Sequence, residues 1–361
     1  MNAPQARGPG SKRSSLGFSK HDCAPDVSRL LDLVSAFPRQ SVPVFGDFVL
    51  DEFVSGEISR VSREAPVLIL RHRATEYLPG GGANAVNNLA DLGAQVFPIG
   101  AVGQDAAGNV LLDYFHKKSV DTSGIVRVPG WITTTKTRFL AGWTHTTDQQ
   151  VLRVDREASS ELPSKARAAL ARKLAHGVRR AGAALVSDYG LGAVTPELVR
   201  KLRVPCLTLD SRHRLLDFRG TGVTAATPNE PEIESLYHRH IGNDLRLLEN
   251  LGRSTLRRLR LKALLITRGK DGMTLFEPGR AMHRIPIYGT NEAVDVTGAG
   301  DTVIAVFTLA LAAGATYLEA AYLANYAGGI VVMKRRTATV TRSELEAALR
   351  SEAGVAQRAE K

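Results

Sequence analysis

The sequence predicts an α/β protein in which helices flank one central, mostly parallel sheet. From about residue 41, short apolar runs alternate with amphipathic stretches, a rhythm typical of successive strand and helix units. Most of these runs end in Asp, Asn or Gly, residues that suit the carboxyl ends of strands. The 361 residues, 43% of them hydrophobic, are enough for one large domain with an appendage.

Six apolar runs are expected to form buried strands of this sheet. Each polar ending taken alone could be only a turn residue. Ligands bind at the carboxyl ends of strands in open parallel sheets, so together the endings indicate one site built from several strands. The runs are SVPVFGD (41–47), QVFPIGAVG (95–103), ALVSDYG (184–190), PCLTLD (205–210), GVTAATPN (222–229) and ALLITRG (263–269).

Two segments, 51–78 and 133–157, break this rhythm because they are rich in β-forming residues and lack a helical period. We expect them to pair into a small β lid outside the main sheet. Strands in such a lid would have exposed edges, which favours a homodimer formed through the lid.

The termini have a different composition from the rest of the chain. The first twenty residues are basic and rich in Gly, Pro and Ser, and they lack the apolar stretch of a secretory signal. We therefore expect a disordered basic leader over 1–38, one folded domain over 39–350 and a C-terminal tail over 351–361.

Composition excludes several classes of function. No apolar run is long enough to span a bilayer, and the two cysteines, Cys23 and Cys206, have no metal-ligand spacing, which suits a reducing cytoplasm. The formal net charge is +11, which could suggest nucleic-acid binding, but Lys and Arg are scattered along the chain. Their clusters at 172–180 and 253–262 are also typical of exposed helix faces. An anionic small-molecule substrate explains part of the charge without nucleic acid, and so does solubility.

The stretch VDVTGAGDTVIAVFTLALAAG (294–314) carries the strongest chemical signal. Gly298, Ala299 and Gly300 lead into an apolar helix, so backbone N–H groups and the positive end of the helix dipole would form an anion pocket. Asp301 beside that pocket would repel a phosphate but could accept a proton from an attacking hydroxyl. The alternative is that Asp301 only caps the helix.

A second glycine loop, LPGGGANAVNNLADLGA (78–94), also runs into a helix. Gly80, Gly82 and Ala85 satisfy the pattern of a dinucleotide fingerprint, with Asp105 about twenty residues further on. The lid-like segment precedes these glycines where that fingerprint needs a buried strand, which argues against a dehydrogenase. Gly269 and Lys270 are followed by Asp271, so there is no P-loop either.

With both loops in view, the chain resembles the ribokinase-like (PfkB) carbohydrate kinases over about residues 40–350. PGGGANAVNNLADLGA and DVTGAGDTVIAVFTLALAAG are similar to the two signatures of that family, in the same order and about two hundred residues apart. TPNEPEIE (227–234) and ITRGKDGM (266–273) are similar to its Asn-x-x-Glu element and its nucleotide-binding strand end. The resemblance implies a ribokinase-like fold and an ATP-dependent kinase.

Within the family, the chain most resembles kinases of D-glycero-β-D-manno-heptose 7-phosphate, which also occur as the kinase half of bifunctional heptose synthases. The stretches are GDFVLDEFVSGEISRVSREAPV (46–67), QQVLRVDRE (149–157), LVSDYGLGAV (185–194) and DVTGAGDTVI (295–304). They imply a stand-alone kinase, without the nucleotidyltransferase half, that makes the 1,7-bisphosphate. Two alternatives stay open: a kinase for another sugar, sugar phosphate or nucleoside, and a silent binding protein on the same fold.

The resemblance also implies roles for individual residues. Asp301 would be the general base, while the N–H groups of Gly298, Ala299 and Gly300 would stabilise the transferring phosphoryl group. The expected sugar-binding residues are Asp47, Asp51, Gly81 and Asn84, and the expected nucleotide-binding residues are Asn229, Thr267, Gly269, Gly272 and Asn325.

Cations are expected at two places. Asn229 and Glu232 would organise Mg²⁺ through its waters. Asp295 and Thr297 resemble a monovalent-cation loop that would make the anion pocket sensitive to K⁺. A sugar phosphate also needs a cationic clamp, for which we expect lid residues, although each alone could be a solvated surface charge: Arg60, Arg63, Lys136 and Arg138.

Three stretches depart from the heptose kinases. DSRHR (210–214) replaces the usual Asp-Pro-Lys, and LAGWTHTTD (140–148) adds residues to the lid. Arg335 and Arg336 stand where relatives have a glycine-containing turn, and we expect them at the adenine side of the nucleotide site.

Overall fold

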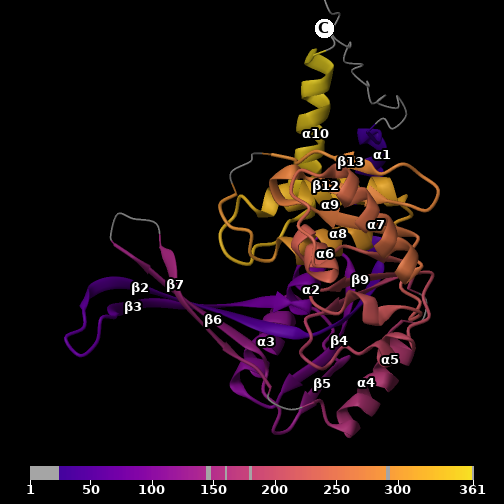
Figure 1. Ribbon diagram of the computed structural model, residues 1–361. Helices are drawn as coiled ribbons and strands as arrows, with labels where there is room; N and C mark the ends of the chain where they lie inside the picture. Colours follow the sequence, from indigo (N-terminus) through magenta and orange to yellow (C-terminus); the bar gives the residue numbers. More distant parts are fainter. Residues whose placement is uncertain (1–23, 144–147, 159–160, 179–180, 290–292, 360–361) are drawn as a thin grey trace, which may run out of the picture.

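The computed structural model describes residues 24–143, 148–158, 161–178, 181–289 and 293–359. These residues form a body of helices around one large sheet, and a long β arm extends from one side of the body (Figure 1). No helix among the described residues is both long and apolar enough to cross a membrane.

The large sheet has nine strands in the order β13-β12-β11-β10-β9-β8-β1-β4-β5. Every pair from β11 to β5 is parallel, and β12 and β13 are added antiparallel at one end. This confirms the predicted fold class. The strands are β1 (Ser41–Gly46), β4 (Gln95–Gly103), β5 (Ile125–Val128), β8 (Ala183–Asp188), β9 (Cys206–Ser211), β10 (Ala225–Ala226), β11 (Ala263–Thr267), β12 (Met273–Phe276) and β13 (His283–Ile285).

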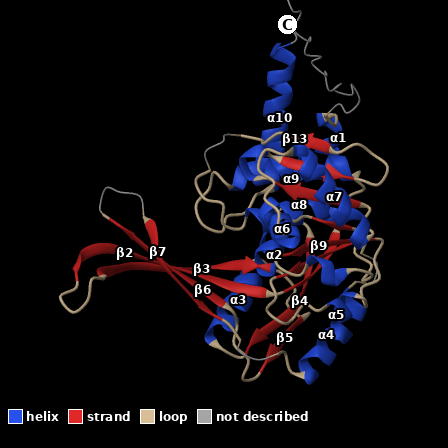
Figure 2. Ribbon diagram, viewed as in Figure 1, coloured by secondary structure: helices blue, strands red, loops and turns tan. Residues whose placement is uncertain are grey.

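Helices cover both faces of this sheet (Figure 2). The apolar residues of a strand alternate between the two faces: on β11, Leu265 packs with one layer and Leu264 with the other. The first layer contains α1 (Val27–Ser35), α2 (Gly82–Asp91), α3 (Ala106–Lys117), α8 (Ala299–Ala312), α9 (Tyr317–Val331) and α10 (Arg342–Ala359). The second contains α4 (Ser164–Gly177), α5 (Pro196–Val199), α6 (Glu230–Tyr237) and α7 (Leu245–Leu259). Short 3₁₀ turns occupy Phe37–Arg39, Leu215–Phe218 and Gly269–Asp271.

The β arm is a separate four-stranded sheet, called the lid sheet below, with the order β3-β2-β6-β7. It consists of β2 (Phe48–Val61), β3 (Leu68–Gly81), β6 (Thr135–Gly142) and β7 (Gln149–Arg156). β2 follows β1 almost directly and β3 runs straight into α2, so the base of the lid sheet is fixed to the body on both strands. Part of the insertion expected at 140–148 lies outside the described residues.

The structure corrects both ends of the predicted domain. Residues 27–35 form α1, although the leader was expected to stay disordered to residue 38, and Leu30, Leu33 and Phe37 are buried in the body. α1 packs against α10, which runs through the boundary expected at residue 350. The apolar face of α1 therefore finds a partner at the opposite end of the chain. Residues 1–23 lie outside the described part.

Candidate active site

The polar strand endings converge where β1 and β8 lie side by side, at the base of the lid sheet. The chain leaves β1 to build β4 and β5 on one side, and builds β8, β9, β10 and β11 on the other, so this is the point where the strand order reverses. Ligands of open α/β sheets bind at such a point. The first turns of α2 and α8 enter the same region, since Asn84 contacts Gly298 and Asp301.

Asp301 lies at the centre of this region, in the first turn of α8, and its residue is only 3% exposed. Its Oδ2 accepts a hydrogen bond from Asn84 Nδ2 at 3.0 Å, and its Oδ1 accepts one from the Tyr189 hydroxyl at 2.8 Å. Burial, assisted by the nearby charge of Asp210, raises the pKa of Asp301 to about 8, although both hydrogen bonds oppose the shift. This carboxyl group can therefore exchange a proton near neutral pH.

The glycine loop before Asp301 packs closely on one side and is open on the other. Gly298 has φ 79°, and an added Cβ would lie 2.5 Å from Asn84 Nδ2, so this position requires glycine. An added Cβ at Gly300 would meet no atom within 4 Å, so the space beside its backbone is free. The N–H of Gly300 has no acceptor within α8 and can bind an anion, whereas Ala299 N already donates to Val296 O at 3.3 Å.

Asp51 lies on β2 and is 4% exposed. Its Oδ1 accepts from Arg138 at 2.6 Å and its Oδ2 accepts from the Thr337 hydroxyl at 2.9 Å. A Cβ at Gly80 would lie 2.6 Å from Asp51 Oδ2, so glycine is needed for this close approach. Asp51 is therefore a fixed acceptor at the base of the lid sheet.

Asp47 is buried at the end of β1, and both of its carboxylate oxygens face the loop after β8. Its two oxygens accept four backbone N–H groups of the loop after β8, from Tyr189, Leu191, Ala193 and Val194. Burial nevertheless raises its pKa to about 6. Asp47 holds the loop that presents Tyr189, which corrects the expectation that it binds a sugar hydroxyl. Gly81 caps α2 with φ 56° and packs against the same loop.

A cavity of about 210 Å³ opens beside Ala299 and Gly300, between α8, α9 and the end of β11. Four of the five residues expected at a nucleotide line it: Thr267, Gly269, Gly272 and Asn325. Lys270, which we did not predict, lines it as well. The wall is otherwise mostly apolar and includes Met273, Ile287, Val303 and Val332, so it offers a dry surface for a planar base next to an anion-binding backbone.

The fifth residue, Asn229, lies outside that lining and caps α6. Asn229 Oδ1 accepts from Glu232 N at 2.8 Å, and Glu232 Oε2 accepts from Asn229 N at 2.9 Å, which is a capping box. Burial raises the pKa of Glu232, and burial together with the charge of Glu232 raises that of Asp210. This pair of desolvated carboxyl groups would gain from a nearby cation.

The donor set of this pair fits Mg²⁺ rather than a softer metal. Both ligands are oxygens, and in the described part of the chain no group of three or more His, Cys, Asp or Glu could enclose a metal ion. Mg²⁺ keeps several waters and shares its sphere with phosphate oxygens, so it needs few protein ligands. Asp210 and Glu232 are the residues that would orient it.

The expected monovalent-cation loop is closed by backbone hydrogen bonds. Asp295 Oδ1 accepts from Thr297 N at 2.9 Å, and Oδ2 accepts from Arg336 N at 2.8 Å. Asp295 thereby connects the loop before α8 with the turn that contains Arg335 and Arg336.

The four expected lid cations do not come together. Arg60 lies nine residues beyond Asp51 along β2, roughly 30 Å at the rise of an extended strand, and Arg63 is further toward the exposed tip. Neither reaches the site of its own chain, which corrects their assignment to a phosphate clamp. Lys136 bonds to Asp155 at 3.3 Å, and only Arg138 contacts a site residue.

Arg335 and Arg336 also differ from expectation. They are absent from the lining of the cavity beside Gly300 and instead line a second cavity of about 270 Å³ under the lid sheet. Their assignment to the adenine wall is therefore wrong.

Sequence reasoning missed three residues that complete the site, namely Tyr189, Asp210 and Thr337. Tyr189 follows β8 and Asp210 lies near the end of β9, both in runs that were predicted as strands, so their place at the sheet edge could have been found. Thr337 could not, because its bond to Asp51 joins residues 286 positions apart.

Comparisons with known proteins agree with this geometry. The profile of the pfkB family carbohydrate kinases matches residues 39–344. The bifunctional protein HldE of Desulfatibacillum aliphaticivorans is 39% identical over 325 residues, which are 88% of this chain and 65% of that protein. HldE of Geobacter sulfurreducens is 39% identical over 314 residues, 85% of this chain and 62% of that protein. The chain thus spans somewhat less than two thirds of these relatives.

Solved structures share the fold at low sequence identity. Arabidopsis thaliana ribokinase complexed with ribose and ATP has a TM-score of 0.68 at 18% identity and covers 86% of this chain and 98% of its own. Phosphofructokinase-2 of Escherichia coli in complex with potassium has a TM-score of 0.70 at 16% identity and covers 87% of this chain and 99% of its own.

Proposed function

The chain belongs to the pfkB family of carbohydrate kinases, and we propose that it transfers the γ-phosphoryl group of ATP to a hydroxyl of a sugar phosphate. The proposed acceptor is D-glycero-β-D-manno-heptose 7-phosphate and the product its 1,7-bisphosphate. The observation that carries the proposal is the convergence on Asp301. Asn84 from the first glycine loop and Tyr189 from the loop after β8 both bond to this carboxylate. Asp301 directly follows Gly300, which lines the cavity, and the charge of Asp51 acts on it.

The proposed reaction uses these groups in a simple order. Asp51 and Asn84 hold sugar hydroxyls, and the reacting hydroxyl gives its proton to Asp301 as its oxygen bonds to the γ-phosphorus. The bond from that phosphorus to the bridging oxygen of ADP breaks. Backbone N–H groups at the start of α8, chiefly that of Gly300, donate to the phosphoryl oxygens as negative charge spreads over them.

ATP would occupy the cavity beside Gly300, with its adenine among the apolar residues and Lys270 near its phosphates. Mg²⁺, oriented by Asp210 and Glu232, would neutralise phosphate charge when bound. We extend to this chain the monovalent cation named for the E. coli phosphofructokinase-2 complex, and assign it no ligand, because both oxygens of Asp295 already accept backbone N–H groups.

The choice of a heptose phosphate rests on two supports. Three of the stretches that resemble heptose 7-phosphate kinases supply Asp51, Tyr189 and Asp301. Tyr189 bonds to Asp301, and Asp51 is near enough for its charge to raise the pKa of Asp301. The curated relatives at 39% identity are named HldE, although this chain spans only part of their length.

We also propose a homodimer formed through the lid sheet. Large apolar side chains are exposed on this sheet and its tip, including Val61, Val67, Leu68, Leu152 and Val154. β3 and β7 are edge strands, and such an exposed apolar surface favours association. Light scattering of the purified chain tests the proposal, and a monomer at micromolar concentration would contradict it.

A coupled ADP-release assay tests the function. ATP, Mg²⁺ and K⁺ would be supplied with heptose 7-phosphate, fructose phosphates, ribose or adenosine. We expect a strong preference for heptose 7-phosphate. Activity with another acceptor would retain the kinase and reject the heptose, and no activity with any acceptor would contradict the proposed function.

A further inference from the structure

We propose that Arg335 and Arg336, together with Arg138, form the subsite that holds the phosphate of the sugar substrate. The proposal rests on the proposed function and deepens it, because it identifies what selects a phosphorylated sugar. The three arginines line the cavity of about 270 Å³ beneath the lid sheet, with Phe53, Leu140 and Gln150 among the other wall residues.

The arginines lie around one aromatic ring. The guanidinium carbon of Arg138 is 5.3 Å from the centroid of Phe53, and that of Arg336 is 5.6 Å from the same centroid. One comes from the lid sheet and the other from the body. Two guanidinium groups that approach from different elements can hold phosphate oxygens between them, as planar and bidentate donors do well.

The backbone at Arg336 is an independent indication. Its φ is 65°, in the left-handed region that favours glycine and that a long side chain adopts at a cost of about 1 kcal/mol. Only four described residues other than glycine have positive φ. A residue kept in this conformation although glycine would relieve the strain indicates that its side chain has a role.

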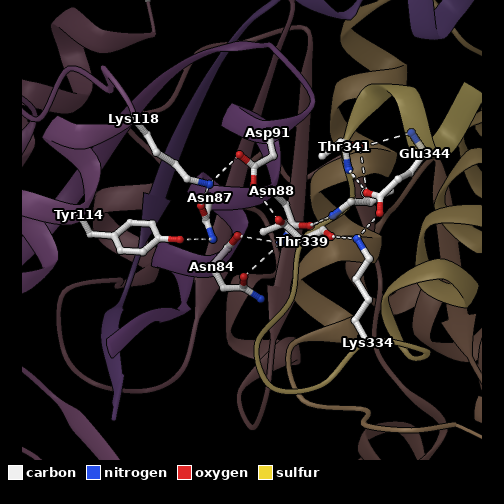
Figure 3. Close-up of polar contacts among 11 residues, drawn as sticks. Asn84, Asn87, Asn88, Asp91, Tyr114, Lys118, Lys334, Thr339, Thr341 and Glu344 are labelled. Carbon is white, nitrogen blue, oxygen red and sulfur yellow. Dashed lines mark hydrogen bonds and ion pairs between the residues drawn. The ribbon is translucent and has the colours of Figure 1, made fainter. Parts of the chain in front are cut away.

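A network of polar contacts holds the turn 334–339, called the double-arginine turn here, against the body (Figure 3). Lys334 Nζ donates to the Thr339 carbonyl at 2.7 Å, closing the turn, and pairs with Glu344 at 2.6 Å. Thr339 donates to Asp91, which Lys118 also contacts at 2.6 Å. The turn is thus anchored to α2 and α10, so its arginines are presented on a rigid support.

The charge of the cavity favours an anion. Its two acidic residues are already engaged, since Asp295 accepts two backbone N–H groups and Asp148 pairs with Arg73 at 3.6 Å. Arg336 pairs with Glu76 of β3, and Arg138 pairs with Asp51. Arg335 is exposed and has no ion-pair partner within the described ranges. A guanidinium group has five donors, so the paired arginines keep some for a phosphate.

The cavity lined by the three arginines lies where the phosphate of a bound sugar phosphate would be expected. Phe53 follows Asp51 by two residues and lies on the same face of β2, about 7 Å further from Asp301. Thr337 bonds to Asp51 and belongs to the double-arginine turn itself. A sugar whose reacting hydroxyl meets Asp301 and whose ring passes Asp51 would place its terminal phosphate here.

The test is the Arg336→Gly variant, which removes the guanidinium and relieves the backbone strain. We expect KM for heptose 7-phosphate to rise about 10- to 100-fold, with little change in kcat, in KM for ATP or in KM for the unphosphorylated heptose. Thermal stability should be unchanged or higher, because the backbone strain is relieved and the lost ion pair is partly exposed to solvent. Arg336→Lys should restore part of the affinity.

Two control variants lose the same charge elsewhere: Arg60→Gln at the lid tip and Arg167→Gln on α4, where the arginine pairs with Glu161. Neither variant should alter KM for heptose 7-phosphate. An equal rise in KM for the phosphorylated and the unphosphorylated sugar in Arg336→Gly would overturn the proposal. So would a rise in KM for heptose 7-phosphate alone in Arg60→Gln instead.

Calorimetric titration of heptose 7-phosphate separates the phosphate subsite from the proposed function. If the wild type binds but does not phosphorylate it, the proposed function fails, and equal affinity of wild type and Arg336→Gly refutes the subsite.

Discussion

At the residue scale, the protonation of Asp301 controls the proposed reaction. A general base must be ionised to accept a proton, yet burial raises the pKa of Asp301 to about 8. We therefore expect kcat/KM to rise with pH along an acid limb near pH 8, measured at low free Mg²⁺. Asp210 contributes to the shift, so increasing Mg²⁺ should move this limb to lower pH. A profile that is flat between pH 6 and 9 would argue against Asp301 as the base.

Tyr189 positions Asp301 without touching the sugar in this account. Its hydroxyl stabilises the ionised carboxylate, so Tyr189→Phe should raise the pKa of Asp301 further and move the acid limb to higher pH. The matched control is Tyr237→Phe on α6, whose hydroxyl bonds to Thr255 at 3.1 Å. A loss of activity without a shift of the limb would mean that Tyr189 has only a structural role.

Some site residues could be predicted from sequence and others could not. Gly298 and Asp301 stand in one local motif, and their chemistry follows from a helix that begins after glycines. Asp47 could not be assigned, because a carboxylate at a strand end looks the same whether it faces a substrate or a loop. The distinction depends on the four N–H groups of residues 189–194, which only the fold brings near.

At the scale of elements, prediction was strongest where a strand is buried on both faces. β4 covers the predicted 95–103, whereas the run expected at 222–229 forms a strand only at Ala225–Ala226, with an isolated bridge from Asn229 to Thr267. Pro228 has no N–H to give to a ladder, which interrupts the pairing between Ala226 and Asn229. α1 was missed because a nine-residue helix is marginal alone and depends on packing against α10.

This dependence gives a prediction for α1. Leu30 is 1% exposed in the first core layer, so Leu30→Ala should lower the free energy of unfolding by about 2–4 kcal/mol. Ser35→Ala, at an exposed position of the same helix, should change it by less than about 0.5 kcal/mol. Denaturant titration of both variants measures this difference. Equal stability of the two would mean that α1 does not pack on the body.

At the scale of the whole molecule, the buried carboxyl groups link stability to pH. The pKa values of Asp47, Glu232, Asp210 and Asp301 are all raised, so the folded chain binds protons that the unfolded chain releases. Stability should therefore fall as pH rises from about 5 to 9. Calorimetry without Mg²⁺ should show Tm decreasing over this range, and the Asp301→Asn variant should show a smaller decrease. An increase of Tm toward pH 9 would contradict the raised pKa values of these four carboxyl groups.

The central claim is that Asp301 accepts the proton in phosphoryl transfer to a sugar phosphate. Single-turnover measurement of Asp301→Asn with saturating ATP, Mg²⁺ and heptose 7-phosphate tests it most directly, because it separates chemistry from binding. The account predicts that the transfer rate falls about 10²- to 10⁴-fold while both substrates still bind. A transfer rate within about tenfold of the wild type would contradict the assignment of Asp301 as general base.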